Sequence, residues 1–236
     1  MTIPTGYRLQ MLKLVIGNKN YSSWSFRPWI AMKVAGIAFE EKVVPLYEPG
    51  SREQILQYSP AGKVPVLVDG EQRIWESLAI LEYLAEKFPK QKFWPDDPRA
   101  RAHARIVATE MHAGFQPLRK SCPMNLWLPV KSRPQSEEVM ANVRRIEFLW
   151  ADCRARFGQG GPFLFGYFGA ADAMYAPVVA RLHSYGLTVG DATRDYMDAV
   201  MALPAWAEWR TAALKESWIL KDDEPEWPLV RGVPVA

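Results

Sequence analysis

The sequence predicts an α/β domain followed by an all-α domain. Residues 11–90 change their hydrophobic period about every ten positions, as alternating strands and helices do. The second half instead carries long patterns of helical period, which are typical of a helical bundle. The turn-rich segment 94–98, Trp-Pro-Asp-Asp-Pro, separates the two patterns. We therefore expect a first domain over residues 11–90, a linker over 91–97 and a second domain over 98–236.

Composition and charge exclude several classes of protein. Hydrophobic residues make up 49% and charged residues 23% of the 236 residues, which is typical of a soluble globular protein. The net charge of +3 is too small to indicate nucleic-acid binding. The chain lacks a run of apolar residues long enough to span a membrane, and residues 1–10 do not show the pattern that a secretory leader is expected to have. We therefore expect a cytoplasmic protein with no membrane segment.

The cysteines and histidines predict no metal site. The two cysteines, Cys122 and Cys153, lie too far apart for a zinc ribbon or a Cys-x-x-Cys redox pair. We expect both to pack as small apolar residues in a reducing compartment. His103 and His112 fall on opposite sides of one predicted helix, and His183 is remote in sequence, so they cannot share an ion.

The first domain is predicted to run strand, helix, strand, helix, strand, strand, helix. Alternation over residues 12–16 predicts a strand that ends in the loop Gly-Asn-Lys-Asn. The next helix has Ser25 as its N-cap and Pro28 in its first turn, and Gly36 closes it. The later elements are a strand over 41–46, a helical segment over 52–58, a hairpin of strands 64–68 and 73–75 joined by Asp69-Gly70, and a helix over 77–88 ended by Pro89.

The second domain is predicted from its helical periods and the breaks between them. The expected helices cover residues 99–120, 136–157, 170–185, 191–202 and 204–215. The tail, residues 222–236, is interrupted by Pro225, Pro228, Gly232 and Pro234. We expect this tail to lie extended along the surface, because those residues break helices.

The loop from the first strand to the first helix carries the clearest candidate chemistry. It contains Ser22, Ser23 and Ser25. Hydroxyls at a helix N-terminus, at the carboxyl edge of a strand, lie where amide donors and the helix dipole converge on an anion. Taken alone, serines in this position more often serve only as helix caps. The absence of a glycine-rich phosphate loop and of a nucleophile elbow argues against phosphate binding and ordinary hydrolysis.

Two further motifs suit a peptide-like ligand. In Lys63-Val64-Pro65, a cis bond before the proline would turn the Val64 amide and carbonyl into a cleft, where an extended ligand could pair with them. An ordinary trans proline on an edge strand is the alternative. At Glu76-Ser77, the hydroxyl and nearby amides could hold a carboxylate while Glu76 pairs with an ammonium group. A simple capping pair is the alternative there.

In this order, the three motifs resemble the glutathione S-transferase family over about residues 11–215. The loop is most similar to the serine-type branch, and closest to zeta-like bacterial members. Trp24 stands where zeta enzymes have cysteine, and this departure argues against zeta-type isomerisation. Ser22 and Ser25 occupy the spacing of the thioredoxin Cys-x-x-Cys, which removes disulfide exchange by the protein's own thiols. The resemblance implies a thioredoxin-like first domain, glutathione as cosubstrate without a metal, and a homodimer.

The resemblance also assigns roles to residues. Ser22, or Ser23 one residue later, would stabilise the glutathione thiolate. The residues implied in glutathione binding are Trp24, Lys63, Val64, Pro65, Glu76 and Ser77. The electrophile would lie near the first helix of the second domain, where the candidates are Met111, His112, Phe115 and Arg119. The apolar members of that set could equally belong to the helical core.

A second-domain motif supports the same family. In residues 163–173, Gly169 stands where the family has a capping Ser or Thr, and Asp172 would complete a capping box.

Three functions follow from the resemblance. The first is a detoxifying transferase that adds the thiolate to a small apolar electrophile or displaces a group on it. The second is a zeta-like cis-trans isomerase of a diketo dicarboxylic acid, with Arg119 as a carboxylate clamp. The third is a non-catalytic interaction protein that keeps the fold.

Overall fold

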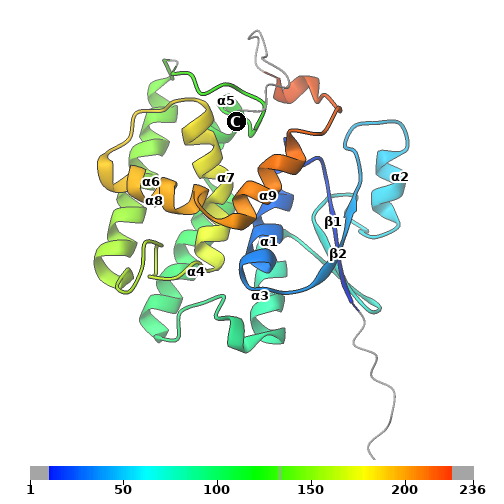
Figure 1. Ribbon diagram of the computed structural model, residues 1–236, viewed down its shortest axis with the longest axis horizontal. Helices are drawn as coiled ribbons and strands as arrows, with labels where there is room; N and C mark the ends of the chain where they lie inside the picture. The colour runs from blue at the N-terminus through cyan, green and yellow to red at the C-terminus, as the bar shows by residue number, and fades with distance from the viewer. Residues whose placement is uncertain (1–10, 133, 225–236) are drawn as a thin grey trace, which may run out of the picture.

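The computed structural model describes residues 11–132 and 134–224 (Figure 1). The strands form a mixed sheet in the order β2-β1-β3-β4. Strand β1 (Leu12–Ile16) pairs in parallel with β2 (Phe39–Val43) and antiparallel with β3 (Val66–Asp69). Strand β4 (Gln72–Trp75) completes a hairpin with β3. A parallel pair needs a crossover, which helix α1 (Ser23–Val34) supplies between β1 and β2.

The sheet is covered on both faces, as the alternation of β1 requires. Leu14 and Ile16 enter the main core, whereas Val15 points into a smaller cluster with Ile55 of α2 (Ser51–Leu56). On the main-core side, α1 and α3 (Ser77–Lys87) pack against each other and face the second half of the chain. A short 3-10 turn, η1 (Pro89–Gln91), follows α3. Helix α1 therefore lies between the sheet and the helical half.

The second half is helical, with α7 at its centre. Its helices are α4 (Pro98–Ala113), α5 (Gln116–Ser121), α6 (Glu137–Phe157), α7 (Ala170–Ser184), α8 (Asp191–Met201) and α9 (Pro204–Ala213), followed by the 3-10 turn η2 (Lys221–Asp223). Nearly every residue of α7 is buried, and this helix contacts α1, α4 and α8. These observations confirm an α/β domain followed by an all-α domain.

Aromatic rings fix α1 against the second half. Phe26 stacks on Trp209 with ring centroids 4.8 Å apart, and it contacts Trp206 edge-on at 5.4 Å. Trp29 meets Trp209 at 5.0 Å. Because these rings are buried, the helix that follows the serine loop is held by both halves of the molecule.

Several element boundaries differ from the predicted ones. The predicted helix 99–120 is two helices, because the chain turns at Gly114 and Phe115 has a φ of 60°. The N-cap position of helix α1 is Ser22 rather than Ser25, and the Ser22 side chain makes no capping hydrogen bond. The second strand begins at Phe39, which pairs with Leu12 of β1. In the tail, residues 221–223 form η2, and residues 225–236 lie outside the described part of the chain.

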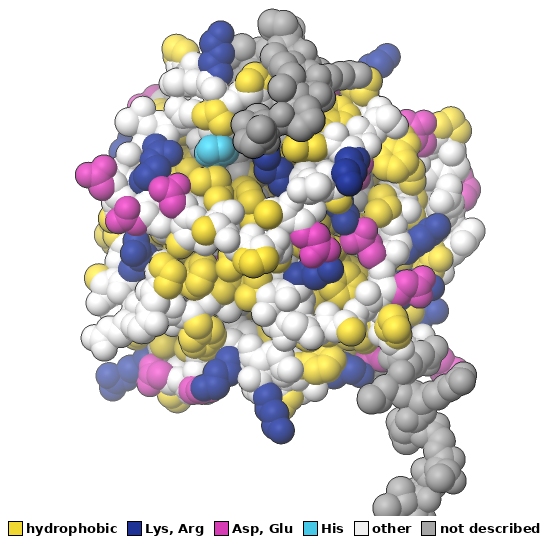
Figure 2. All heavy atoms as spheres, viewed as in Figure 1, with side chains coloured by type: hydrophobic (Ala, Val, Ile, Leu, Met, Phe, Trp, Pro, Cys, Tyr) yellow, Lys and Arg dark blue, Asp and Glu magenta, His cyan; other side chains and the backbone are white. Residues whose placement is uncertain are grey.

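The surface shows charges of both signs. Figure 2 shows Lys and Arg interspersed with Asp and Glu over the viewed face, in keeping with the small net charge of +3. Within residues 11–132 and 134–224, no helix has the length and apolar content needed to cross a bilayer.

Candidate functional site

Two adjoining cavities form a cleft at the junction between the two halves. Their volumes are about 460 Å³ and 870 Å³. Both are lined by Trp24, Lys63, Val64, Gln116 and Arg119. The smaller cavity adds Glu76 and Ser77, and the larger one adds Ser22 and Ser23. The cleft therefore brings together the three motifs, which lie far apart in the sequence.

The serine loop places two hydroxyls at the start of α1. Ser22 is the N-cap, and its hydroxyl donates to Ser25 Oγ at 2.7 Å. The Gly17 amide donates to the same Ser25 oxygen at 3.1 Å. Ser23 Oγ accepts a hydrogen bond from Arg181 Nη2 at 3.2 Å. Since hydroxyls rotate, both Ser22 and Ser23 can turn a proton toward an anion in the larger cavity.

Three arginines surround this loop. The Arg27 guanidinium is fully buried, donates to Ser23 O at 2.9 Å and lies 4.2 Å from the Trp24 ring centroid. On the same ring, the Arg119 guanidinium lies 4.6 Å from the centroid. Arg181 donates to Cys122 O and Pro177 O as well as to Ser23. In the described part of the chain, none of the three guanidinium groups forms an ion pair with a carboxylate.

Burial lowers the pKa of the arginines in this group. Desolvation, together with the charges of Arg181 and Arg119, lowers the pKa of Arg27 well below its ordinary value. Desolvation and the Arg119 charge lower the pKa of Arg181 to about 10, while Tyr185, Cys122 and Asp223 oppose the shift. Arg181 therefore stays charged at neutral pH and gives the serine end of the cleft a positive potential.

The other end of the cleft is built around β3 and the start of α3. The Val64-Pro65 bond is cis, and Val64 lines both cavities. Ser77 is buried at the first turn of α3, and Glu76 before it has a left-handed φ of 68° and a side chain 55% exposed. The Glu76 carboxylate is thus open to a ligand, and His112 Nε2 lies 3.8 Å from Glu76 Oε2.

Known families match both halves of the chain. The family model described as "Glutathione S-transferase, N-terminal domain" matches residues 21–87, and the one described as "Glutathione S-transferase, C-terminal domain" matches residues 136–212. Together they cover more than half of the chain. The chain belongs to the glutathione S-transferase family. Its sheet and helices are accordingly a transferase fold, with the thioredoxin-like part first.

Curated relatives extend this result. A probable maleylacetoacetate isomerase of Caenorhabditis elegans is 41% identical over 41% of this chain and 45% of the relative. A zeta-class glutathione S-transferase of Euphorbia esula is 37% identical over 44% and 47%. In these alignments the chain spans about half the length of the relatives. Glutathione S-transferase 1 of Dianthus caryophyllus is 28% identical over 76% of the chain and 82% of the relative.

Solved transferases share the fold. Human glutathione S-transferase T1-1 in its apo form superposes with a TM-score of 0.62 at 25% identity, covering 86% of this chain and 90% of the human one. A Burkholderia glutathione transferase homologue with bound glutathione gives a TM-score of 0.64 at 21% identity, covering 86% and 98%.

Two of the predicted electrophile-site residues lie outside the cleft. Met111 is fully buried and Phe115 is 8% exposed, and both belong to the main core. His112 and Arg119 do line the cleft. His112 also packs edge-on against Trp24 at 5.2 Å, so the polar members of the predicted set reach the cavity while the apolar members stabilise the bundle.

Arg181 is the main cleft residue that the sequence interpretation missed. The signal was present, because an arginine stands in an otherwise apolar stretch of α7, between Ala180 and Leu182. A buried charge in such a position usually has a specific partner or a functional role. Gln116 and Met124 also line the cleft and carry no comparable signal.

The two cysteines and His103 of this chain lie outside the cleft. Cys122 and Cys153 are free and buried, and burial raises the pKa of each thiol to about 12. His103 approaches Asp152 rather than His112, with Nε2 3.0 Å from Oδ2. Over residues 11–132 and 134–224, no group of three or more His, Cys, Asp or Glu side chains is arranged to hold a metal ion.

Proposed function

We propose that this transferase binds glutathione in the cleft and stabilises its thiolate at the serine loop, for addition to a small electrophile or displacement on it. One observation carries the proposal: the Ser22 and Ser23 hydroxyls line the same cleft as Val64 and the Glu76-Ser77 pair. The γ-glutamyl end would bind at Glu76 and Ser77, and the cysteinyl backbone at Val64. The thiol would then lie beside the serines, with Lys63, Pro65 and Trp24 lining the ligand.

Thiolate formation needs little free energy. An ordinary thiol has a pKa of about 8.5, so lowering it by about 2 units requires about 2.7 kcal/mol. A hydrogen bond to a charged group contributes about 1.5 to 3 kcal/mol, and a helix N-terminus about 0.3 to 1 kcal/mol. One serine hydroxyl and the α1 N-terminus together reach this sum, so no proton-abstracting base is required.

The Ser22→Ala variant tests the assignment of the hydroxyl. We expect the pH at which the conjugation rate is half-maximal to rise, and kcat/KM at neutral pH to fall by about 10- to 100-fold, because one hydrogen bond to the sulfur is lost. The measurement is a pH–rate profile with a chromogenic aryl halide.

Ser23→Ala is the matched control, since it removes a neighbouring hydroxyl from the same loop. Its profile should stay close to that of the wild type. A shift in Ser23→Ala alone would move the role to Ser23, and unchanged profiles in both variants would contradict thiolate stabilisation by this loop.

The second substrate would occupy the larger cavity. Leu46, Tyr47 and Met124 supply apolar surface there. The family resemblance further implies a cytoplasmic homodimer, in which the first domain of one subunit faces the helical domain of the other. Non-catalytic binding of a protein partner is the alternative, and it would be favoured if glutathione failed to bind at millimolar concentration.

The arginines favour a second candidate reaction, the cis-trans isomerisation of a diketo dicarboxylic acid. Arg119 and Arg181 line the larger cavity and form no ion pair with a carboxylate among the described residues, so they could hold the two acid groups. An isomerase would convert such an acid without net loss of thiol, and Arg119→Gln would raise its KM. Conversion accompanied by stoichiometric consumption of glutathione would instead support the transferase.

A further inference from the structure

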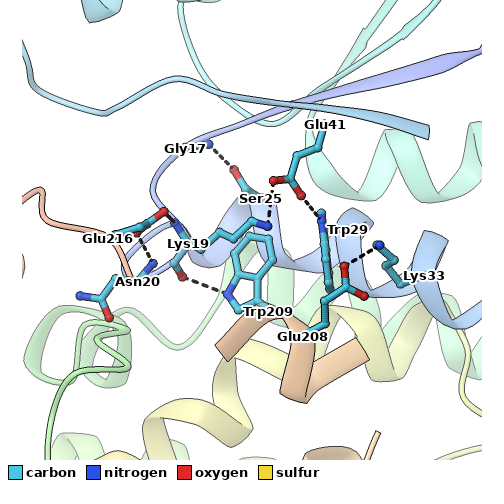
Figure 3. Close-up of polar contacts among 10 residues, drawn as sticks. All are labelled: Gly17, Lys19, Asn20, Ser25, Trp29, Lys33, Glu41, Glu208, Trp209 and Glu216. Carbon is cyan, nitrogen blue, oxygen red and sulfur yellow. Dashed lines mark hydrogen bonds and ion pairs between the residues drawn. The ribbon is translucent and has the colours of Figure 1, made fainter. Parts of the chain in front are cut away.

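The turn that leads into the serines is held by the second half of the molecule. Residues 17–21 connect β1 to α1 and form an irregular turn (Figure 3). Glu216, which lies just beyond α9, accepts a hydrogen bond from the Lys19 amide at Oε1, 2.7 Å away, and from the Asn20 amide at Oε2, 2.9 Å away. From α9 itself, Trp209 Nε1 donates to Lys19 O at 2.9 Å. Two amides and one carbonyl of this turn are therefore hydrogen-bonded to the second half of the chain.

The Glu216 carboxylate is committed to these two amides. The Lys19 ammonium group lies elsewhere, 2.8 Å from Glu41 Oε1 and over the Trp29 and Trp209 rings, as Figure 3 shows. Burial raises the pKa of Glu216, while the Asn20 and Lys19 amides and the Lys19 charge oppose this effect. Hydrogen bonds from amides to a carboxylate are about twice as strong as those to a neutral acceptor. Glu216 is thus a strong, paired acceptor for consecutive peptide groups.

The position of this turn determines the position of Ser22. The Ser22 amide donates to Asn18 O at 2.8 Å. This hydrogen bond closes a turn that contains Lys19 and Asn20. The Asn20 side chain adds a second anchor, because its Oδ1 accepts from the Leu126 amide at 2.7 Å. Moving the peptide groups of Lys19 and Asn20 would therefore move the N-cap residue of α1.

We propose that Glu216 is a positioning residue for thiolate formation. It lines neither cavity of the cleft, so it acts through the turn, by fixing where the Ser22 hydroxyl meets the sulfur. This inference rests on the proposed function. Catalytic geometry tolerates displacements of only about 0.5 Å, and a displacement of about 1 Å reduces rates by about 100-fold.

Glu216→Gln is the first test. Glutamine keeps the shape but offers one oxygen and one NH₂ group, so one of the two amides would face a donor. We expect the pKa of the bound glutathione thiol to rise by about one unit and kcat/KM at neutral pH to fall by about tenfold. The affinity for S-methylglutathione should change by less than about threefold, because the Val64 and Glu76-Ser77 contacts stay in place. Ultraviolet absorbance of the thiolate against pH gives the pKa.

Glu208→Gln is the matched control. Glu208 is also a carboxylate at the α9 side of α1, but it is 54% exposed and pairs with Lys33 at 2.6 Å, toward the C-terminal end of α1. The same substitution there should leave the thiol pKa unchanged. Glu216→Asp keeps the charge on a side chain one methylene shorter, and it should raise the thiol pKa by less than Glu216→Gln does.

The outcomes separate the two proposals. A wild type that binds no glutathione overturns the proposed function itself. A wild type with a lowered thiol pKa, combined with a folded Glu216→Gln variant that titrates at the same pKa, overturns the positioning role, even if that variant is less stable. If Glu216→Gln does not fold, Glu216→Asp decides: a raised thiol pKa supports the role, and an unchanged one overturns it.

Discussion

Ser25 and Arg181 determine which hydroxyl protons of the serine loop are available to a ligand. The Ser22 hydroxyl donates its proton to Ser25 Oγ, whereas the Ser23 oxygen accepts a hydrogen bond from Arg181. An oxygen that already accepts a hydrogen bond is a better donor through its own proton. Ser25 Oγ also accepts a hydrogen bond from the Gly17 amide at 3.1 Å, so it keeps a partner when the Ser22 hydroxyl turns its proton toward a ligand. Single residues behind the cleft thus prepare its surface for an anion.

Glutathione should supply the reactive thiol, because the protein's own thiols are inert. Cys122 and Cys153 are both 0% exposed, and burial raises their pKa to about 12. We expect the native protein not to react with a thiol-specific disulfide reagent at mildly alkaline pH, and to expose two thiols per chain after unfolding in denaturant. Rapid reaction of one thiol in the native state would contradict the burial of that residue.

At the scale of elements, the start of α7 explains a departure from the family pattern. Gly169 caps this helix, and a Cβ atom there would lie 2.9 Å from the Phe93 carbonyl oxygen. That oxygen accepts the Ala170 amide at 2.8 Å, so it is fixed in place. A serine would not fit without a shift of the backbone. Asp172 supplies the side chain that stabilises this helix start. Its carboxylate accepts hydrogen bonds from the Gly169 amide at 2.9 Å and the Leu164 amide at 3.0 Å.

Asp172→Ala should therefore destabilise the fold. Its carboxylate is fully buried and also accepts from Tyr196 Oη at 3.1 Å, so alanine leaves three donors without a partner. Each unsatisfied buried donor costs about 1 to 3 kcal/mol, and we expect the free energy of unfolding to fall by about 3 kcal/mol or more. Denaturant titration measures this. Asp198→Ala, at an exposed position of α8, should stay within about 0.5 kcal/mol of the wild type.

Local signals predicted the elements well, and contacts between distant segments account for the differences. Strand β1 and the Asp69-Gly70 hairpin follow from alternation and turn chemistry within a few residues. The break at Gly114 was missed because the apolar period continues through Leu118, so that the sequence resembles one helix. In the cleft, the apolar surroundings of Arg181 mark it as an unusual buried charge, but its partner could not be predicted, because its contact with Ser23 joins residues 158 positions apart.

At the scale of the whole molecule, the cleft exists only where the two halves meet. A single main core runs through α1 and α3 into α4, α6 and α7. Polar contacts at the same junction join Asn20 to Asn125 at 3.1 Å and Lys19 and Asn20 to Glu216. The helical half therefore both closes the cleft and fixes the loop that would stabilise the thiolate.

Proton release on glutathione binding tests this account most directly. Calorimetric titrations of the wild type with glutathione, in buffers of different ionisation enthalpy slightly above neutral pH, count the protons released per ligand bound. We expect most of one proton to be released with glutathione, because its thiol ionises in the cleft, and almost none with S-methylglutathione, which has no thiol proton. No binding at millimolar glutathione, or binding with equal proton release for the two ligands, would contradict thiolate stabilisation in the cleft.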